Sequence, residues 1–159
     1  MASKNVRAGL LAGLGALLLT VLAIATAIWL LVFRTSEQER FMTARGKLCE
    51  RGKTESCDAL RSACEKRSGE ACVALADAQL APGPKHDVRE ALRLLDDGCT
   101  HHYGPACSRG GRVALSGTEL PKDVPRAKDF LRRGCEIGQK DDCALVEGLA
   151  SGGAAEGQR

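Results

Sequence analysis

The eight cysteines of this 159-residue chain fall into four pairs that share one spacing. The partners are eight positions apart in every pair: Cys49 and Cys57, Cys64 and Cys72, Cys99 and Cys107, Cys135 and Cys143. A helical pattern ends near the first cysteine of a pair and another begins near the second. Short connections of this kind join antiparallel helices, and close packing brings their Cα atoms within the roughly 4.4–6.8 Å of a disulfide. The spacing therefore predicts four local disulfides, each across a helical hairpin.

Free buried cysteines and a zinc site are the two alternatives to disulfides. Structural zinc sites usually supply their ligands in tight C-x2–4-C pairs, and the chain contains no CxxC. Free cysteines are common core residues, but they give no reason for four identical spacings in an even set. Disulfides remain the prediction, with no metal site.

An uncharged apolar segment precedes the cysteines, from Ala8 to Phe33. Its 26 residues make a helix of about 39 Å, enough to cross a hydrocarbon core of about 30 Å. A cleaved secretory signal is the alternative, with small residues at 25–27. The apolar run continues to Phe33, however, beyond the length of a typical signal core. We expect a short tail at 1–7, an uncleaved transmembrane signal anchor at 8–33, and a polar juxtamembrane helix or linker at 34–46.

The orientation of this anchor involves two conflicting signals. The N-terminal side carries only Lys4 and Arg7, whereas the C-terminal side carries six basic residues within twenty positions: Arg34, Arg40, Arg45, Lys47, Arg51 and Lys53. The positive-inside rule alone would place the C-terminal part in the cytoplasm. That rule applies to short loops, and disulfides require an oxidising compartment. We therefore expect a cytoplasmic N-terminus and an extracytoplasmic domain.

Gly9 and Gly13 form a G-x-x-x-G motif within the apolar segment. Such a motif lets two membrane helices pack closely, which makes a homodimer through these glycines one hypothesis. Glycine is frequent in membrane helices in any case, so an unpaired anchor is the alternative.

Residues 47–152 contain an internal helical repeat. The segments 88–99 and 124–135 align without gaps, with apolar or small residues at steps 0, 3, 6, 7 and 10, which form one stripe on a helix. Asp87 and Asp123 precede these helices as N-caps, and Pro125 falls in a first turn. The partner helices are expected to begin near Ala71, Ala106 and Asp142, and to end near residues 83, 117 and 152. The period of 35 to 36 residues predicts an all-α fold in which hairpins stack as a short α-solenoid, followed by a disordered tail at 153–159.

The residues from Cys107 to Cys135 resemble a Sel1-like repeat. The resemblance rests on the run Ala114-Leu115-Ser116-Gly117, followed by Leu120, Asp123, Ala127, Leu131 and Gly134. The C-x7-C pairs resemble the cysteine-rich secreted branch, the Helicobacter cysteine-rich proteins. Glu119 replaces the usual second glycine of the turn, and the turn at 83–87 is two residues short, which leaves the number of repeats open.

This resemblance implies a tetratricopeptide-like stack that acts as a protein-binding adaptor, with the partner on its concave face. Some cysteine-rich members are β-lactamase-like, so a cell-wall-related hydrolase is the alternative by analogy. The implied location is a bacterial inner membrane with the repeat domain in the periplasm.

Motifs for catalysis and nucleic-acid binding are missing from the sequence. No S-x-x-K, G-x-S-x-G or H-E-x-x-H occurs, so we expect no enzyme, catalytic residue or cofactor. The serines after the anchor are expected to be caps and surface positions: Ser36, Ser56, Ser62, Ser68, Ser108, Ser116 and Ser151. From Arg34 on, 21 Lys and Arg face 20 Asp and Glu, since Lys4 and Arg7 account for the other two of the 23. Such a balance does not favour nucleic-acid binding.

Three histidines and two charged pairs complete the candidate polar sites. His101 and His102, with His86 elsewhere, could bind a transition metal, but adjacent side chains on a turn rarely converge, so a solvated loop is expected. The acidic pair at 96–97 and the basic pair at 132–133 occupy matching positions in successive repeats. They predict a solvated helix surface, with a charged binding face as the alternative.

Overall fold

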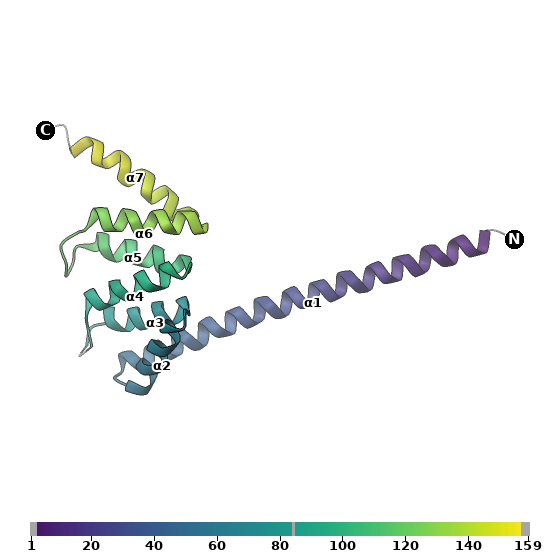
Figure 1. Cartoon of the computed structure of the whole chain (residues 1–159), viewed down its shortest axis with the longest axis horizontal. Helices are drawn as coiled ribbons and strands as arrows, with labels where there is room; N and C mark the ends of the chain where they lie inside the picture. Colours follow the sequence, from purple (N-terminus) through teal and green to yellow (C-terminus); the bar gives the residue numbers. More distant parts are fainter. Residues whose placement is uncertain (1–2, 84, 157–159) are drawn as a thin grey trace. The chain divides into compact units, whose positions relative to one another are not determined.

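The structure is a computed structural model that describes residues 3–83 and 85–156, with side chains placed at 18–33, 37–83 and 85–151. The described residues form seven helices and no strand: α1 (Ser3–Glu50), α2 (Thr54–Glu65), α3 (Gly69–Leu80), α4 (Val88–Thr100), α5 (Gly104–Ser116), α6 (Val124–Ile137) and α7 (Lys140–Glu156) (Figure 1). The prediction of an all-α fold is confirmed.

The chain divides into two compact units, residues 1–40 and 41–159. In the first unit, α1 carries an apolar stretch that is long enough to cross a membrane by length and composition. All the placed side chains from 18 to 33 are exposed. The surroundings of Gly9 and Gly13 lie outside the residues whose side chains are described, so dimerisation through them remains a hypothesis.

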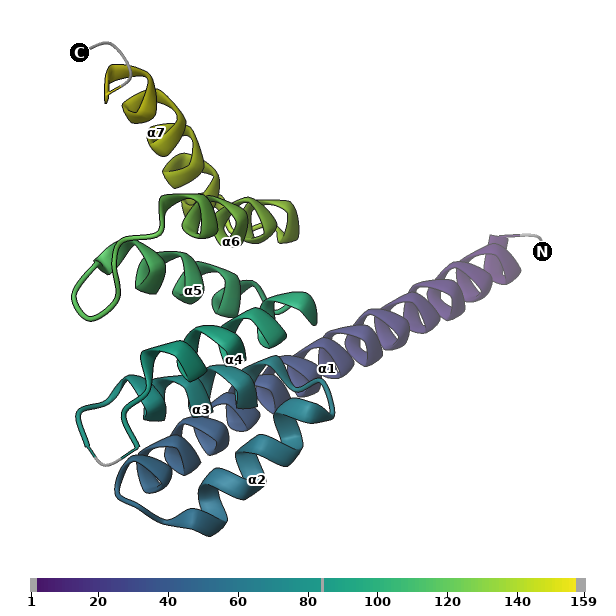
Figure 2. The same cartoon turned by 60° about the vertical axis from the view of Figure 1, so that its left-hand side comes forward.

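In the second unit, each helix packs against the next one along the chain, from α2 to α7. Figure 2 shows these helices following one another in chain order. Contacts also join every second helix: α4 contacts both α2 and α6, and α3 contacts α5. The helices therefore form two rows, with α2, α4 and α6 in one and α3 and α5 in the other.

The helix boundaries follow local capping. The Oδ1 atom of Asp87 accepts hydrogen bonds from the N–H groups of Arg89 and Glu90 at 2.9 and 3.1 Å. Asp123 caps α6 in the same way through Arg126 N–H. The predicted caps are thus confirmed. Gly117 and Gly138 follow α5 and α6 with positive φ values of 63° and 104°, the left-handed conformation that glycine adopts without strain.

The predicted ends of the partner helices need correction. Helices α3, α5 and α7 begin at residues 69, 104 and 140, two residues before the predicted starts. For α3 the reason is a cap that the prediction missed, because Ser68 Oγ accepts a hydrogen bond from Ala71 N–H. At the other end, α3 stops at residue 80, and α7 continues to residue 156, past the expected end at 152.

Close approach between α5 and α6 depends on two glycines. A Cβ atom at Gly110 would lie 2.5 Å from a ring carbon of Phe130, and one at Gly111 would lie 2.6 Å from Leu131 Cγ. Phe130 and Leu131 are 1% and 0% exposed. The missing side chains of α5 therefore make the space that the two large side chains of α6 fill.

Candidate functional site

The structure places all eight cysteines at the junctions between helices. The S–S distances are 2.06, 2.02, 2.05 and 2.04 Å for the pairs 49–57, 64–72, 99–107 and 135–143, and the Cα atoms lie 4.7–4.9 Å apart. Small residues beside the cysteines permit this approach. A Cβ atom at Gly98, for example, would lie 2.9 Å from Ala106 Cβ. Every pair therefore fastens the end of one helix to the start of the next.

The adjacent histidines lie in the turn between α4 and α5. His101 is the C-cap of α4, and His102 has a positive φ of 59° and an exposed side chain. Within the described residues, no group of three or more His, Cys, Asp or Glu side chains is placed to hold a metal ion. The metal hypothesis therefore gains no support from the described residues of this turn. The solvated loop remains a prediction.

His86 has a partner that the sequence did not reveal. Its Nε2 atom forms a hydrogen bond and ion pair with the Glu119 carboxylate, and its Nδ1 atom lies 3.2 Å from the Ala81 carbonyl oxygen. The bond to Glu119 raises the pKa of His86, and desolvation partly opposes this shift. Both ring nitrogens face acceptors, so the protonated ring satisfies both. The α3–α4 turn is thereby linked to the α5–α6 turn.

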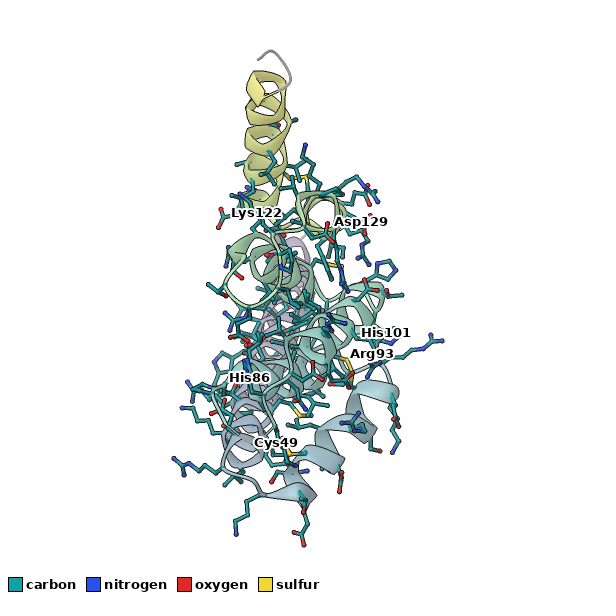
Figure 3. The ribbon with its side chains drawn as sticks, turned by 90° about the vertical axis from the view of Figure 1, so that its left-hand side faces the viewer. Cys49, His86, Arg93, His101, Lys122 and Asp129 are labelled. Carbon is teal, nitrogen blue, oxygen red and sulfur yellow. A yellow bond between two sulfur atoms is a disulfide. The ribbon has the colours of Figure 1, made fainter. Side chains whose placement is uncertain are left out.

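One ion pair joins the two charged pairs predicted at matching positions, and their other members are paired within their own helices. Arg133 Nη2 donates to Asp96 Oδ1 at 2.6 Å, and Arg93 Nη1 donates to Asp97 Oδ2 at 2.7 Å. On α6, Arg132 bridges two acidic residues of its own helix. These charges largely neutralise each other, which favours the surface interpretation over a binding face with free charge. Figure 3 shows Arg93 and Asp129 on one side of the ribbon, with His86 and Lys122 on the other.

A buried polar pair joins α5 to α7. Ser108 Oγ donates to Asp142 Oδ2 at 2.6 Å, and Asp142 is 0% exposed. The other carboxylate oxygen, Oδ1, is buried without a hydrogen-bond partner among the described residues. Ser108 is half-buried, and its contact with Asp142 is one that the interpretation as a cap or surface residue did not include. The missing side chain at Gly134 leaves room for the Asp142 carboxylate.

An open hollow of about 570 Å³ lies where α4, α5, the α5–α6 turn and the start of α6 meet. Its volume falls in the range of about 300–1,000 Å³ of typical ligand sites. The floor is apolar, with Leu92, Val113, Ala114 and Leu120. Polar side chains surround it: Arg89, Lys122, Asp123 and Arg126. No sequence motif marks this site, because its residues come from three helices and a turn.

Neither known protein-family models nor curated proteins give a match to this sequence. The resemblance to Sel1-like repeats therefore remains an expectation based on the residues.

Proposed function

We propose that this chain is a membrane-anchored, extracytoplasmic adaptor that binds a protein partner on a short α-solenoid of Sel1-like hairpins. The two rows of helices and the contacts between every second helix support a solenoid. A period of 35 to 36 residues matches a two-helix unit. Four helix junctions, α1–α2, α2–α3, α4–α5 and α6–α7, are each closed by a cysteine pair at bonding distance.

The apolar and exposed side chains of α1 support the anchor in this proposal. A helix with apolar residues around its whole circumference is favoured in lipid, and all the placed side chains from 18 to 33 are exposed. Four cysteine pairs at bonding distance favour an oxidising compartment. The proposed arrangement is an anchor at 8–33 in a bacterial inner membrane, a cytoplasmic N-terminus and a periplasmic repeat domain.

The open hollow is the observation that favours binding as the activity. It combines an apolar floor with an exposed polar rim, the composition of a recognition site. A hydrolase would need a serine within reach of a base. Ser108 donates a hydrogen bond to Asp142, but Asp142 is 0% exposed and buried between helices, so this contact serves packing and offers no support for the hydrolase alternative.

Site-specific photo-crosslinking in cells tests the adaptor proposal. A benzophenone amino acid replaces Leu120, which lines the hollow, in the full chain with its anchor. The matched control carries the same group at Arg132, an exposed position on α6 outside the hollow. We expect a discrete adduct from position 120 and none from position 132. The absence of adducts from position 120 and from further positions along both rows of helices would contradict the proposal.

A further inference from the structure

We propose that the hollow binds an acidic segment of the partner protein, with one aliphatic side chain of that segment on the apolar floor and Asp or Glu residues on either side. This inference rests on the proposed adaptor function and names the chemistry of its partner. We call the site the basic hollow, defined by the rim residues Arg89, Lys122 and Arg126 and the floor residues Leu92, Val113, Ala114 and Leu120.

The three cationic side chains of the rim are available to a ligand. Arg89, Lys122 and Arg126 are exposed and form no ion pair with a carboxylate among the described residues. The guanidinium of Arg126 lies 5.9 Å from the centre of the Phe130 ring, which leaves its N–H groups available. By contrast, Arg93 and Arg133, on the same two helices, are each bound to two carboxylates. The positive charge of the rim is thus not neutralised within the stack.

The acidic groups that lie close to the rim residues in the sequence already have partners. Asp123 is the single acidic residue among those lining the hollow, and its Oδ1 atom caps α6 through the N–H of Arg126. Asp87 caps α4 in the same way, and Glu119 is paired with His86. Three cations and one carboxylate leave the lining with a formal charge of +2. The N-terminal turn of α6 adds the positive end of a helix dipole, so the site favours an anion.

The floor of the hollow is suited to an aliphatic side chain. Leu92 is 4% exposed and Ala114 is 5% exposed, and both form part of the buried core. Pro121 in the α5–α6 turn and Pro125 in the first turn of α6 line the same hollow and restrict the backbone there. Binding to a turn that is restricted in advance loses less conformational entropy. An aliphatic residue flanked by carboxylates would therefore satisfy the floor and the rim together, which a purely acidic or purely apolar segment does not.

Binding of short peptides to the full chain tests this inference. The chain is held in nanodiscs of neutral phosphatidylcholine, and the probes are capped peptides with a neutral fluorophore: Glu-Glu-Leu-Glu-Glu, Glu-Glu-Gly-Glu-Glu and Lys-Lys-Leu-Lys-Lys. We expect saturable binding of the first peptide, measured by fluorescence anisotropy, that weakens as salt is raised. The glycine peptide should bind several-fold more weakly, and the lysine peptide should not bind. Equal binding of the leucine and glycine peptides would overturn the role of the floor.

Charge reversal on the rim provides the matched comparison. The double variant Lys122→Glu/Arg126→Glu should weaken binding of the leucine peptide about tenfold or more. Glutamate at position 126, in the first turn of α6, is compatible with the helix. The control Arg112→Glu/Lys140→Glu changes the net charge equally at exposed positions outside the hollow and should leave affinity within about twofold. Equal losses in both variants, or no loss in either, would overturn the inference.

The outcomes separate this inference from the adaptor proposal. If photo-crosslinked adducts still form at Leu120 in the Lys122→Glu/Arg126→Glu chain, the partner is not recognised by its acidity and only the inference fails. If no position along the stack gives an adduct, the adaptor proposal fails as well.

Discussion

At the scale of single residues, Asp142 stands out because successive repeats have alanine at its position. Ala71 and Ala106 precede the second cysteine of their pairs, and each is 0% exposed. Asp142 is equally buried, and only one of its two carboxylate oxygens has a hydrogen-bond partner among the described residues. A buried polar group that loses its partner costs about 1–3 kcal/mol, whereas replacing both partners by apolar groups can be almost neutral. Ser108 and Asp142 are therefore expected to tolerate replacement together but not singly.

A double-mutant cycle measures this coupling. Ser108→Ala alone should destabilise the domain by about 1–3 kcal/mol, because it leaves the buried carboxylate without a donor. Adding Asp142→Ala should restore most of this loss, since alanine is the residue at this position in the neighbouring repeats. Urea unfolding of the full chain in detergent, followed by circular dichroism, gives both values. If the double variant loses the sum of the two single losses, the pair is not coupled and the explanation is wrong.

The ion pair of His86 predicts a pH-dependent contribution to stability. Because the hydrogen bond to Glu119 raises the pKa of His86 in the folded state, the contribution is fully present below the ordinary histidine pKa of about 6.5. It is lost as the pH rises through the raised folded-state pKa. The melting temperature of the wild type should therefore exceed that of His86→Gln by more at pH 6 than at pH 9.

Glu119→Gln is the matched variant for this titration. It removes the charge that raises the pKa while keeping a polar side chain of similar size. The variant should show the same flattened pH profile as His86→Gln. A difference between wild type and His86→Gln that is the same at pH 6 and pH 9 would rule out the ion pair as its source.

At the scale of helices, local signals were predicted well and long-range contacts were not. The caps at Asp87 and Asp123 depend on hydrogen bonds within three residues, so the pattern of neighbouring residues reveals them. The fit of Gly110 against Phe130 joins two helices. The pair of His86 and Glu119 spans 33 positions. The spacing of residues within one segment cannot reveal these contacts, because the two partners lie on different segments.

The basic hollow was missed for the same reason. Its rim draws Arg89 from α4, Lys122 from the α5–α6 turn and Arg126 from α6. The sequence predicts each of these helices but singles out none of these three basic residues. The sequence does not show which basic side chains lack an acidic partner in the folded chain. That depends on packing, as the binding of Arg133 to Asp96 across two helices shows.

The cysteine pairs allow a prediction about whole helices. All four pairs close rings of the same size, so each should remove a similar unfolded-state entropy, worth about 2.5 kcal/mol in the chain-entropy model. Differences between them must then come from packing. Cys99 and Cys107 are 2% and 0% exposed and join α4 to α5 in the middle of the stack. Cys135 and Cys143 are half-buried and join α6 to the last helix, α7. Replacing the pair 99–107 by alanines should cost about 2–5 kcal/mol and exceed the cost of the same change at 135–143.

Urea unfolding of the two double-alanine variants, side by side with the wild type, checks this order. The equal ring size makes each variant the control for the other. Equal losses would mean that ring closure dominates and that packing at the junction adds little. A larger loss at 135–143 would contradict the assignment of the central helices as the more tightly packed part of the stack.

At the scale of the whole chain, charge and sulfur chemistry favour opposite orientations. Six basic residues follow the apolar stretch within twenty positions, against two before it, and for a membrane-spanning stretch this asymmetry alone would favour a cytoplasmic domain. Four cysteine pairs at bonding distance favour an oxidising compartment, because cytoplasmic thiols are kept reduced. The two signals differ in strength. Long domains are translocated largely regardless of charge, whereas structural disulfides are rare in the cytoplasm.

Reporter fusions at the C-terminus decide between these orientations. Alkaline phosphatase, which needs disulfides of its own, and green fluorescent protein, which fluoresces after export only poorly, are each joined after Arg159 and expressed in bacteria. We expect high phosphatase activity and weak fluorescence. Lys4→Gln/Arg7→Gln should lower the phosphatase signal, because it removes the basic residues that retain the N-terminus inside. Strong fluorescence with an inactive phosphatase would place the helices in a reducing compartment. The disulfides would then not form, and the proposals of a periplasmic adaptor and of an acidic partner outside the cytoplasm would both be wrong.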